Sequence, residues 1–186
     1  MDKELKTEFR LDDGIVLRAW REEDVEIGLD AVLRNREHLR PYVHWMTDDY
    51  SIDHSRKFLT EAIANRKART NLGLGIFRDE RLIGSIGFVK FDWDARKTEI
   101  GYWLDKAEVG KGIVTRACRE LITYAFEELG MNRIEIQCSA ENLPSAAIPE
   151  RLGFTKEGVL RQAHIRGGKL HDFNIYGLLA EDPRPN

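Results

Sequence analysis

Two glycines separated by a single residue lie directly before the most regular helical pattern of the chain. The segment is Glu108-Val109-Gly110-Lys111-Gly112-Ile113-Val114-Thr115. Glycines let the backbone turn tightly and approach a ligand, and the first turn of a helix leaves N–H groups without partners. These N–H groups and the helix dipole favour a bound anion. The spacing therefore predicts a diphosphate-binding loop, with an ordinary glycine turn as the alternative interpretation.

Other phosphate-binding motifs fit this segment poorly. A dinucleotide-binding fingerprint requires a third glycine, and a P-loop ends in Gly-Lys-Ser or Gly-Lys-Thr. Neither pattern occurs here, because Gly112 is followed by Ile113 and Val114. The expected anion contacts are consequently those of a helix N-terminus reached through a short glycine loop.

A second segment combines helix-start signals with a hydroxyl group. Asn142 is a favourable N-cap, and Pro144 fits the first helical turn. Pro149 lacks an N–H group and so leaves the Ser145 carbonyl without its usual helical partner. We predict a short helix over Leu143–Leu152 with a local distortion beside Ser145. A well-capped helix without a chemical role is the alternative interpretation.

Hydrophobic periodicity predicts the elements that position these segments. Apolar residues repeating every second position indicate strands, and a period near 3.6 residues indicates helices. The expected strands are residues 15–20, 72–77, 82–91, 98–104, 133–138, 155–165 and 169–179. The expected helices are residues 24–38, 53–67, 113–129 and 143–152.

The order of these elements predicts the fold class. Short polar turns join the strands between residues 72 and 104, which favours antiparallel pairing, whereas a long helix between two strands requires a right-handed parallel crossover. We predict an α/β (α+β) domain over residues 1–186, with a mixed, mostly antiparallel central sheet of about seven strands flanked by helices. Residues 182–186 are expected to form a flexible tail.

Composition and charge exclude several classes of protein. The formal net charge is −3 with both signs interspersed, so direct nucleic-acid binding is not expected. The two cysteines, Cys118 and Cys138, have no histidines at ligand spacing, which argues against a metal site or a disulfide framework. No apolar run approaches the ~20 residues of a membrane span, and the N-terminus has no secretory signal. The cytoplasm is the expected location, with no membrane partner.

The two chemical segments resemble motifs A and B of the GNAT superfamily of N-acetyltransferases. Motif A, Q/R-x-x-G-x-G/A, is similar to Val109–Val114, with departures at Val109 and Val114. Motif B, N-x-x-S-x-x-x-x-E-[KR]-x-G-F, is similar to Asn142–Phe154. Together with Ile100–Leu104 the resemblance covers most of the chain. It is closest to the RimJ/RimL-like group, whose named members acetylate the N-termini of ribosomal proteins.

The resemblance implies a GNAT-like fold, acetyl-CoA as co-substrate and no metal. It assigns the pyrophosphate to the main chain of Val109, Gly110, Lys111, Gly112, Ile113, Val114 and Thr115, and the pantetheine arm to Asn142. In the related group the strand around Tyr102–Leu104 splays from its neighbour. Backbone groups near Trp103 and Leu104 then bind the pantetheine and polarise the acetyl carbonyl. A homodimer is expected on the same basis.

Acetyl transfer requires a base, because an amine attacks a thioester only when it is neutral. His164 is the first candidate, at a position where the related group often carries a glutamate, and Glu99 is the second. A surface strand residue is the alternative interpretation of each. Ser145 is expected to serve the leaving thiolate. Both cysteines lie on expected inward faces, which favours direct transfer in a ternary complex.

The acceptor side is the least specified part of the sequence. The segment 35–46 is rich in aromatic and polar residues, and in related proteins it lines the acceptor side; His44, Trp45 and Tyr102 are the candidate contacts. Packing at a helix junction is the alternative for His44 and Trp45. The predicted acceptor is a protein N-terminus. A small-molecule amine, such as a polyamine or aminoglycoside, and a non-catalytic acyl-CoA sensor remain alternatives.

Overall fold

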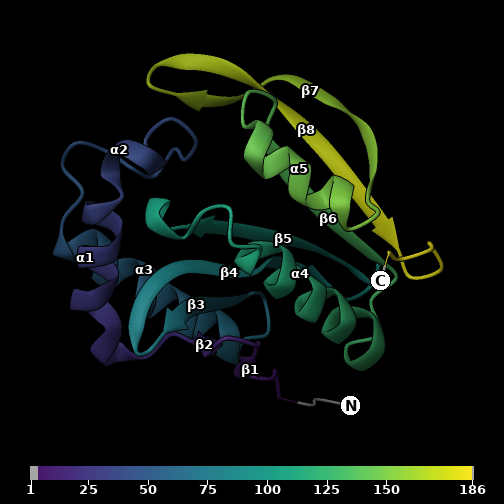
Figure 1. Cartoon of the computed structure of the whole chain (residues 1–186), viewed down its shortest axis with the longest axis horizontal. Coiled ribbons are helices and arrows are strands. Elements are labelled where there is room, and N and C mark those ends of the chain that lie inside the picture. Colours follow the sequence, from purple (N-terminus) through teal and green to yellow (C-terminus); the bar gives the residue numbers. More distant parts are fainter. Residues whose placement is uncertain (1–3, 186) are drawn as a thin grey trace.

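A single sheet with helices on both faces forms the body of the computed structural model, which describes residues 4–185 (Figure 1). Among these residues the sheet has eight strands in the order β1-β2-β3-β4-β5-β6-β8-β7. Neighbouring strands pair antiparallel except β5 and β6, which are parallel. The predicted fold class is confirmed, with one strand more than expected.

The predicted strands and helices recur with small shifts at their ends. The strands are β1 (Glu8–Arg10), β2 (Ile15–Ala19), β3 (Leu72–Arg78), β4 (Arg81–Asp92), β5 (Lys97–Leu104), β6 (Arg133–Ser139), β7 (Thr155–Arg166) and β8 (Lys169–Leu179). The helices are α1 (Val25–Arg34), α2 (Arg36–Leu39), α3 (Ile52–Lys67), α4 (Ile113–Thr123) and α5 (Leu143–Arg151). Three single turns are η1 (Glu22–Asp24), η2 (Lys106–Glu108) and the π-helical turn η3 (Tyr124–Glu128).

Three local features differ from the predicted pattern. Strand β1 spans three residues and buries only Phe9, too little to give a detectable alternation. The helix expected over residues 24–38 is interrupted at Asn35, whose side chain donates to the Ala31 carbonyl and accepts from the N–H of Lys106. The helix expected over residues 113–129 ends as the π-helical turn η3. The interruption at Asn35 arises from a contact with a distant part of the chain.

The two faces of the sheet carry different helices. In Figure 1, α4 and α5 lie in front of the sheet, and α1 and α3 lie beside and behind it. The largest core cluster includes Ile113, Ala117 and Leu121 of α4 with the inner residues of the strands. A separate cluster joins Trp20 and Phe77 to Leu59 of α3. Burial of each of the isoleucine, leucine and phenylalanine side chains among them stabilises the fold by about 1.5–3 kcal/mol.

Strands β5 and β6 separate soon after they meet. Their parallel pairing covers only Lys97–Glu99 against Arg133–Glu135. Beyond this point β5 continues along β4 as far as Leu104, and β6 continues along β8 as far as Ser139. The sheet therefore opens between the second half of β5 and the second half of β6, as the resemblance implied.

The last described residues lie against the domain. The Asp182 carboxylate accepts a hydrogen bond from the N–H of Leu179 at 2.8 Å, and the Arg184 guanidinium lies 5.3 Å from the ring centre of Phe126. A Cβ atom on Gly153 would lie 2.8 Å from Pro185. The flexibility of residues 182–186 stays a prediction, and Asn186 lies outside the described residues. No helix of residues 4–185 is both long and apolar enough to span a bilayer.

Candidate active site

The opening between β5 and β6 exposes backbone groups of alternate β5 residues. The N–H of Asp105 donates to the Ile83 carbonyl at 2.7 Å, and Ser85–Trp103 is a pair in the same register. Backbone groups alternate in direction along an antiparallel strand, so Trp103 directs its N–H and C=O toward β4. Tyr102 and Leu104 direct theirs to the other side, from which β6 has separated. These two residues supply the backbone donors and acceptors at the opening.

The loop before α4 has the backbone geometry that an anion site requires. Gly110 and Gly112 adopt φ angles of 84° and 70°, in the left-handed region that favours glycine, and Gly112 is the N-cap. A Cβ atom on either glycine would meet nothing within 4 Å, so the space beside the loop is open. The first bond of the helix runs from the N–H of Arg116 to the Gly112 carbonyl. The preceding N–H groups at 113–115 are therefore available to a ligand.

The departures from motif A do not obstruct this loop. Val114 is 7% exposed and belongs to the core cluster under α4, so its side chain fills the protein interior. Val109 is 47% exposed and precedes the two glycines in the loop. The backbone of the loop therefore keeps its anion-binding geometry with valine at both positions.

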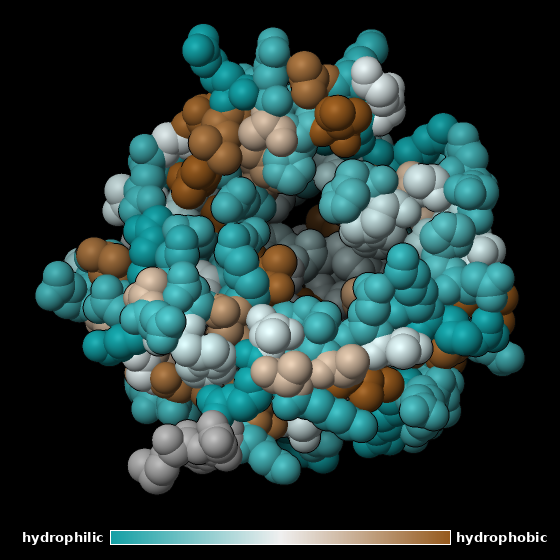
Figure 2. Space-filling view, turned by 180° about the vertical axis from the view of Figure 1, so that it is seen from behind, coloured by the Kyte–Doolittle hydropathy of each residue, from teal (hydrophilic) through white to brown (hydrophobic). Residues whose placement is uncertain are grey.

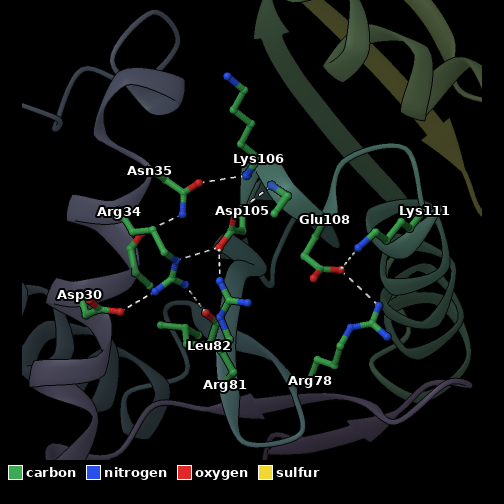
Figure 3. A network of polar contacts seen from close by, with 12 residues as sticks. Asp30, Arg34, Asn35, Arg78, Arg81, Leu82, Asp105, Lys106, Glu108 and Lys111 are labelled. Carbon is green, nitrogen blue, oxygen red and sulfur yellow. Dashed lines mark hydrogen bonds and ion pairs between the residues drawn. The ribbon is translucent and has the colours of Figure 1, made fainter.

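A buried carboxylate fixes the turn η2 that leads into the loop (Figure 3). Asp105 accepts hydrogen bonds from Arg34 at 3.0 Å, Arg81 at 3.3 Å and the N–H of Ala107 at 3.0 Å. Burial raises the pKa of Asp105, but these hydrogen bonds and the charge of Arg34 outweigh it and hold the pKa below its usual value. Asp105 therefore stays ionised and ties the turn to α1 and to the β3–β4 hairpin.

A second buried carboxylate holds the loop itself. Glu108 contacts the Arg78 guanidinium at 3.3 Å and the Lys111 ammonium at 3.1 Å (Figure 3). Its side chain is 8% exposed, so both contacts are made in a largely dry environment. Since Lys111 lies between the two glycines, this pairing fixes the side chain next to the expected anion site.

Tyr102 and Ser145 join β5 to α5 across the opening. Asn142 caps the helix by accepting from the N–H of Ser145 at 3.2 Å, as predicted. The Tyr102 hydroxyl donates to the Ser145 carbonyl at 3.1 Å and accepts from the Ser145 hydroxyl at 3.3 Å. That carbonyl is the one that Pro149 leaves without a helical partner, so Tyr102 replaces the missing N–H. The sequence predicted that the Ser145 carbonyl lacks its helical partner, but not that Tyr102 donates to it instead.

Cys138 lies next to this pair, a placement that the sequence did not reveal. The thiol is 5% exposed, and burial raises its pKa although the nearby Ser145 lowers it. Burial also raises the pKa of Cys118, which lies in the core under α4. Both thiols are therefore protonated at neutral pH, which disfavours a nucleophilic role. Among residues 4–185, no group of three or more His, Cys, Asp or Glu side chains could hold a metal ion.

His164 lies on β7, near the turn of the β7–β8 hairpin. Its ring stacks on Phe173 with centres 3.7 Å apart, and Phe173 pairs with Ser139 at the end of β6. Burial and then the charge of His44 lower the pKa of His164. The structure thus brings His164 and His44 together at the end of the β7–β8 hairpin. The Tyr102–Ser145 pair is a separate cluster.

Glu99 occupies the closed end of the opening. It is paired with Glu135 of β6 and lies 3.7 Å from the Lys90 ammonium. Burial raises the pKa of Glu99, although the nearby positive charge of Lys90 acts to lower it. Glu99 and Tyr102 are three positions apart along β5, roughly 10 Å at the rise of an extended strand. A direct contact between Glu99 and an acetyl group near Leu104 is therefore not expected.

An aromatic cavity of about 590 Å³ lies on the α1–α3 side of the sheet. Figure 2 views the molecule from the side opposite to Figure 1, and a hollow opens near the middle of that side. The aromatic residues that line the cavity are Trp20, Trp45, Tyr50, Phe58, Phe88, Tyr102 and Trp103, of which Tyr102 and Phe88 direct their rings to the α4–α5 face. Trp45 also packs near Tyr50, with ring centres 6.0 Å apart. Two of the three expected acceptor contacts, Trp45 and Tyr102, thus border this cavity, and His44 lies beside His164.

Solved structures with the same fold bind coenzyme A. A structure of RimL, described as a ribosomal L7/L12 alpha-N-protein acetyltransferase in complex with coenzyme A, superimposes with a TM-score of 0.88 at 27% identity, covering 92% of this chain and 97% of RimL. The microcin C7 self immunity acetyltransferase MccE, in complex with acetyl-CoA and AMP, also gives a TM-score of 0.88, at 29% identity, covering 95% and 98% of the two chains.

Sequence comparisons agree with this likeness. The chain is 36% identical over 174 residues to YdaF of Bacillus subtilis (strain 168), which bears the name "Putative ribosomal N-acetyltransferase"; the match covers 93% of this chain and 95% of YdaF. Residues 15–155 match the family model of the GNAT acetyltransferase domain. The chain belongs to the GNAT acetyltransferase family and is an acetyl-CoA-dependent N-acetyltransferase.

Proposed function

We propose that this enzyme transfers the acetyl group directly to the N-terminal amine of a protein, in a ternary complex with acetyl-CoA. One observation carries the proposal: Tyr102 takes part in both sides of the site. Its hydroxyl contacts Ser145 on the α5 side, and the residue also lines the aromatic cavity on the α1–α3 side. A coenzyme on one face and an amine on the other would therefore meet at the opening beside β5.

On the coenzyme side, backbone groups provide most of the proposed contacts. The N–H groups of the loop Gly110–Gly112 and of residues 113–115 would hold the pyrophosphate, with Val109 at the loop entrance, and the Asn142 side chain would hold the pantetheine arm. Acetyl-CoA supplies an activated thioester. The N–H groups of Tyr102 and Leu104 would polarise its carbonyl, because they point into the opening. Trp103, which was expected to share this role with Leu104, directs its N–H toward β4 instead.

Ser145 is the proposed donor to the leaving thiolate. Its hydroxyl donates to the Tyr102 hydroxyl, which in turn donates to the Ser145 carbonyl. Burial raises the pKa of Tyr102, so this hydroxyl keeps its proton at neutral pH. The Ser145 hydroxyl would turn from Tyr102 to donate a hydrogen bond to the sulfur, while Tyr102 keeps its bond to the Ser145 carbonyl.

His164 is the proposed base on the acceptor side. Its lowered pKa keeps the imidazole neutral at pH 7, the form that accepts a proton. A protein N-terminus has a pKa of ~7.7–8.0, against ~10.4 for lysine, so a histidine suffices for the former. His44 and Trp45 would contact the acceptor near it. Glu99 is the second candidate and would act through a water molecule.

The names of similar proteins support two acceptor classes. RimL and YdaF bear names that refer to ribosomal proteins, which favours a protein N-terminus here. MccE is a self-immunity acetyltransferase for microcin C7, which keeps a small-molecule amine as the second candidate. A non-catalytic acyl-CoA sensor is the third. A cytoplasmic location and a homodimer belong to the same proposal, and sedimentation velocity tests the dimer.

Release of free thiol from acetyl-CoA with a panel of amines separates these candidates. The panel contains peptides with free and with blocked N-termini, a polyamine and an aminoglycoside. We expect turnover with free N-termini, none with blocked N-termini and little with polycations. Turnover only with polycations would favour the small-molecule acceptor. Binding of acetyl-CoA without turnover on any amine would favour the sensor.

A further inference from the structure

We infer that the aromatic cavity binds the acceptor residue that follows the reactive amine, and that it selects a bulky apolar side chain at this second position. This inference rests on the proposed function, since it takes the acceptor to be a peptide. The cavity borders both Tyr102 and Trp103, where the opening between β5 and β6 lies. A chain whose amine reaches the opening would therefore place its next residue in the cavity.

Three glycines in register form the floor of the cavity. Gly73 of β3 pairs with Gly87 of β4, and Gly87 pairs with Gly101 of β5. All three line the cavity, so a strip of sheet three strands wide has no side chains on this face. Glycine weakens a strand, and its presence within one often marks a site where a ligand approaches the backbone.

Packing explains one of these glycines but not the others. A Cβ atom on Gly87 would lie 2.1 Å from the Leu72 carbonyl oxygen, which excludes any side chain there. A Cβ atom on Gly73 would lie 3.4 Å from its nearest neighbours in Trp20, and one on Gly101 would meet only a side-chain methyl of Val89 at 2.9 Å. An alanine therefore fits at Gly73, where glycine keeps the cavity open.

Two residues that line the cavity each carry a buried polar atom without a hydrogen-bond partner among the described residues. One is the indole nitrogen of Trp20, a side chain that is 3% exposed and lies over Gly73. The other is the side-chain oxygen of Asn71. Both atoms lie beneath the cavity surface, so they would reach a ligand only if their side chains turned. A peptide unit, which offers a C=O and an N–H, would then match them.

The charges of the lining disfavour a polycationic occupant of the cavity. Besides two tyrosines, the ionisable residues that line the cavity are His54, Lys57 and Glu61, of which only Glu61 is a carboxylate. A polyamine or aminoglycoside carries several ammonium groups and needs several carboxylates to replace its hydration. Aromatic rings instead favour a side chain such as phenylalanine or isoleucine, whose burial brings about a 10- to 100-fold gain in affinity.

The test uses peptides that share an N-terminal serine and differ in the second residue, which is phenylalanine, isoleucine, alanine or aspartate. We expect kcat/KM for the phenylalanine and isoleucine peptides to exceed that for the alanine peptide by at least tenfold, mainly through KM. Equal kcat/KM values across the four peptides would overturn the inference while leaving N-terminal acetylation intact. Absence of turnover with every peptide would instead overturn the proposed function.

Two variants link this selectivity to the cavity. Gly73→Ala raises the floor beside Trp20, and we expect it to lower the ratio of kcat/KM between the phenylalanine and alanine peptides at least threefold. Trp20→Phe keeps an aromatic ring but removes the N–H, so it should raise the KM of every peptide. Gly158→Ala is the matched control, because Gly158 is also a strand glycine and a Cβ atom there would meet nothing within 4 Å. An unchanged ratio in Gly73→Ala would place the second residue elsewhere.

Discussion

On the α4–α5 face of β5, hydrogen bonds and ion pairs hold the functional groups, whereas the α1–α3 face presents aromatic rings around a cavity. The first face contains the Tyr102–Ser145 pair and the loop before α4, which Glu108 holds through Arg78 and Lys111. The second is lined by rings with one carboxylate, Glu61, among its ionisable residues. The polar contacts of the first face fix the positions of the groups proposed to bind the coenzyme. The second face offers a ligand mainly its shape and its apolar surface.

This difference follows from what each face is proposed to bind. The coenzyme carries phosphates and a thioester whose positions do not vary, so a network that holds the loop and the helix start in place lowers the cost of binding. An acceptor is recognised by the fit of its own side chain. Mutations on the two faces should consequently change different kinetic parameters.

The largest effect is expected from removing the proposed base. His164→Gln keeps size and some hydrogen bonding but cannot take a proton at neutral pH, so kcat should fall by ~10²–10⁴-fold with little change in acetyl-CoA binding. In the unmodified enzyme, activity should decrease as the pH falls through the lowered pKa of His164, below the usual ~6.5.

The measurement is kcat/KM from pH 5 to 9 with an acceptor of known pKa. His171→Gln is the control, because His171 is paired with His164 on the neighbouring strand. His164→Glu should recover part of the rate and move the acidic limb to lower pH. A His164→Gln enzyme with the original rate and pH profile would transfer the role to Glu99 or to a bound water.

The next effect concerns the coenzyme loop. Gly112→Glu adds bulk and negative charge where pyrophosphate is proposed to bind, and should weaken coenzyme A binding about 100-fold or more in calorimetric titrations, as expected for like charges held close together. Gly130→Glu is the matched control. Gly130 has a φ of 68° and equally open surroundings, so both variants carry the same backbone strain. Equal affinity in the two variants would contradict the phosphate-loop interpretation.

A moderate effect is expected at the contact between the strands and α5. Tyr102→Phe leaves the Ser145 carbonyl without its donor and should lower the free energy of unfolding by about 1–3 kcal/mol. Pro149→Ala restores the helical N–H for that carbonyl, so Tyr102→Phe should cost less in this background. Urea denaturation of the four proteins of this double-mutant cycle measures the coupling. Strictly additive effects would show that Tyr102 does not replace the missing N–H.

The smallest effect is expected from the cysteines. Replacing Cys118 and Cys138 together with alanine should leave turnover within several-fold of the original, apart from packing losses, because burial keeps both thiols protonated. Mass spectrometry after mixing with acetyl-CoA alone checks the mechanism. An acetylated cysteine would overturn direct transfer and assign Cys138, next to Ser145, a covalent role.

The sequence predicted the features that depend on neighbouring residues. The capped helix after Asn142, the glycine loop before α4 and the parallel crossover all follow from local spacing, and the structure contains each of them. The interruption at Asn35 was not predictable, because it depends on the N–H of Lys106 on a distant turn. Local signals therefore sufficed for the coenzyme side of the site.

Features that depend on strand register could not be predicted from local signals in the sequence. Tyr102 meets Ser145 only because β5 and β6 separate and α5 packs across the opening. The glycines at 73, 87 and 101 are ordinary residues of three strands until the pairing places them in one row. The acceptor side is built mainly from such contacts, which is why the sequence specified it poorly.

Hydrogen exchange with each substrate alone tests most directly whether the two faces bind different partners. We predict that coenzyme A slows the exchange of the backbone amides in residues 102–116 and 142–146, and leaves α3 (Ile52–Lys67) and the start of β3 unchanged. A peptide acceptor should instead slow exchange in residues 43–58 and 71–75. Protection of α3 by coenzyme A, or of the loop before α4 by the peptide alone, would contradict the assignment of the two faces.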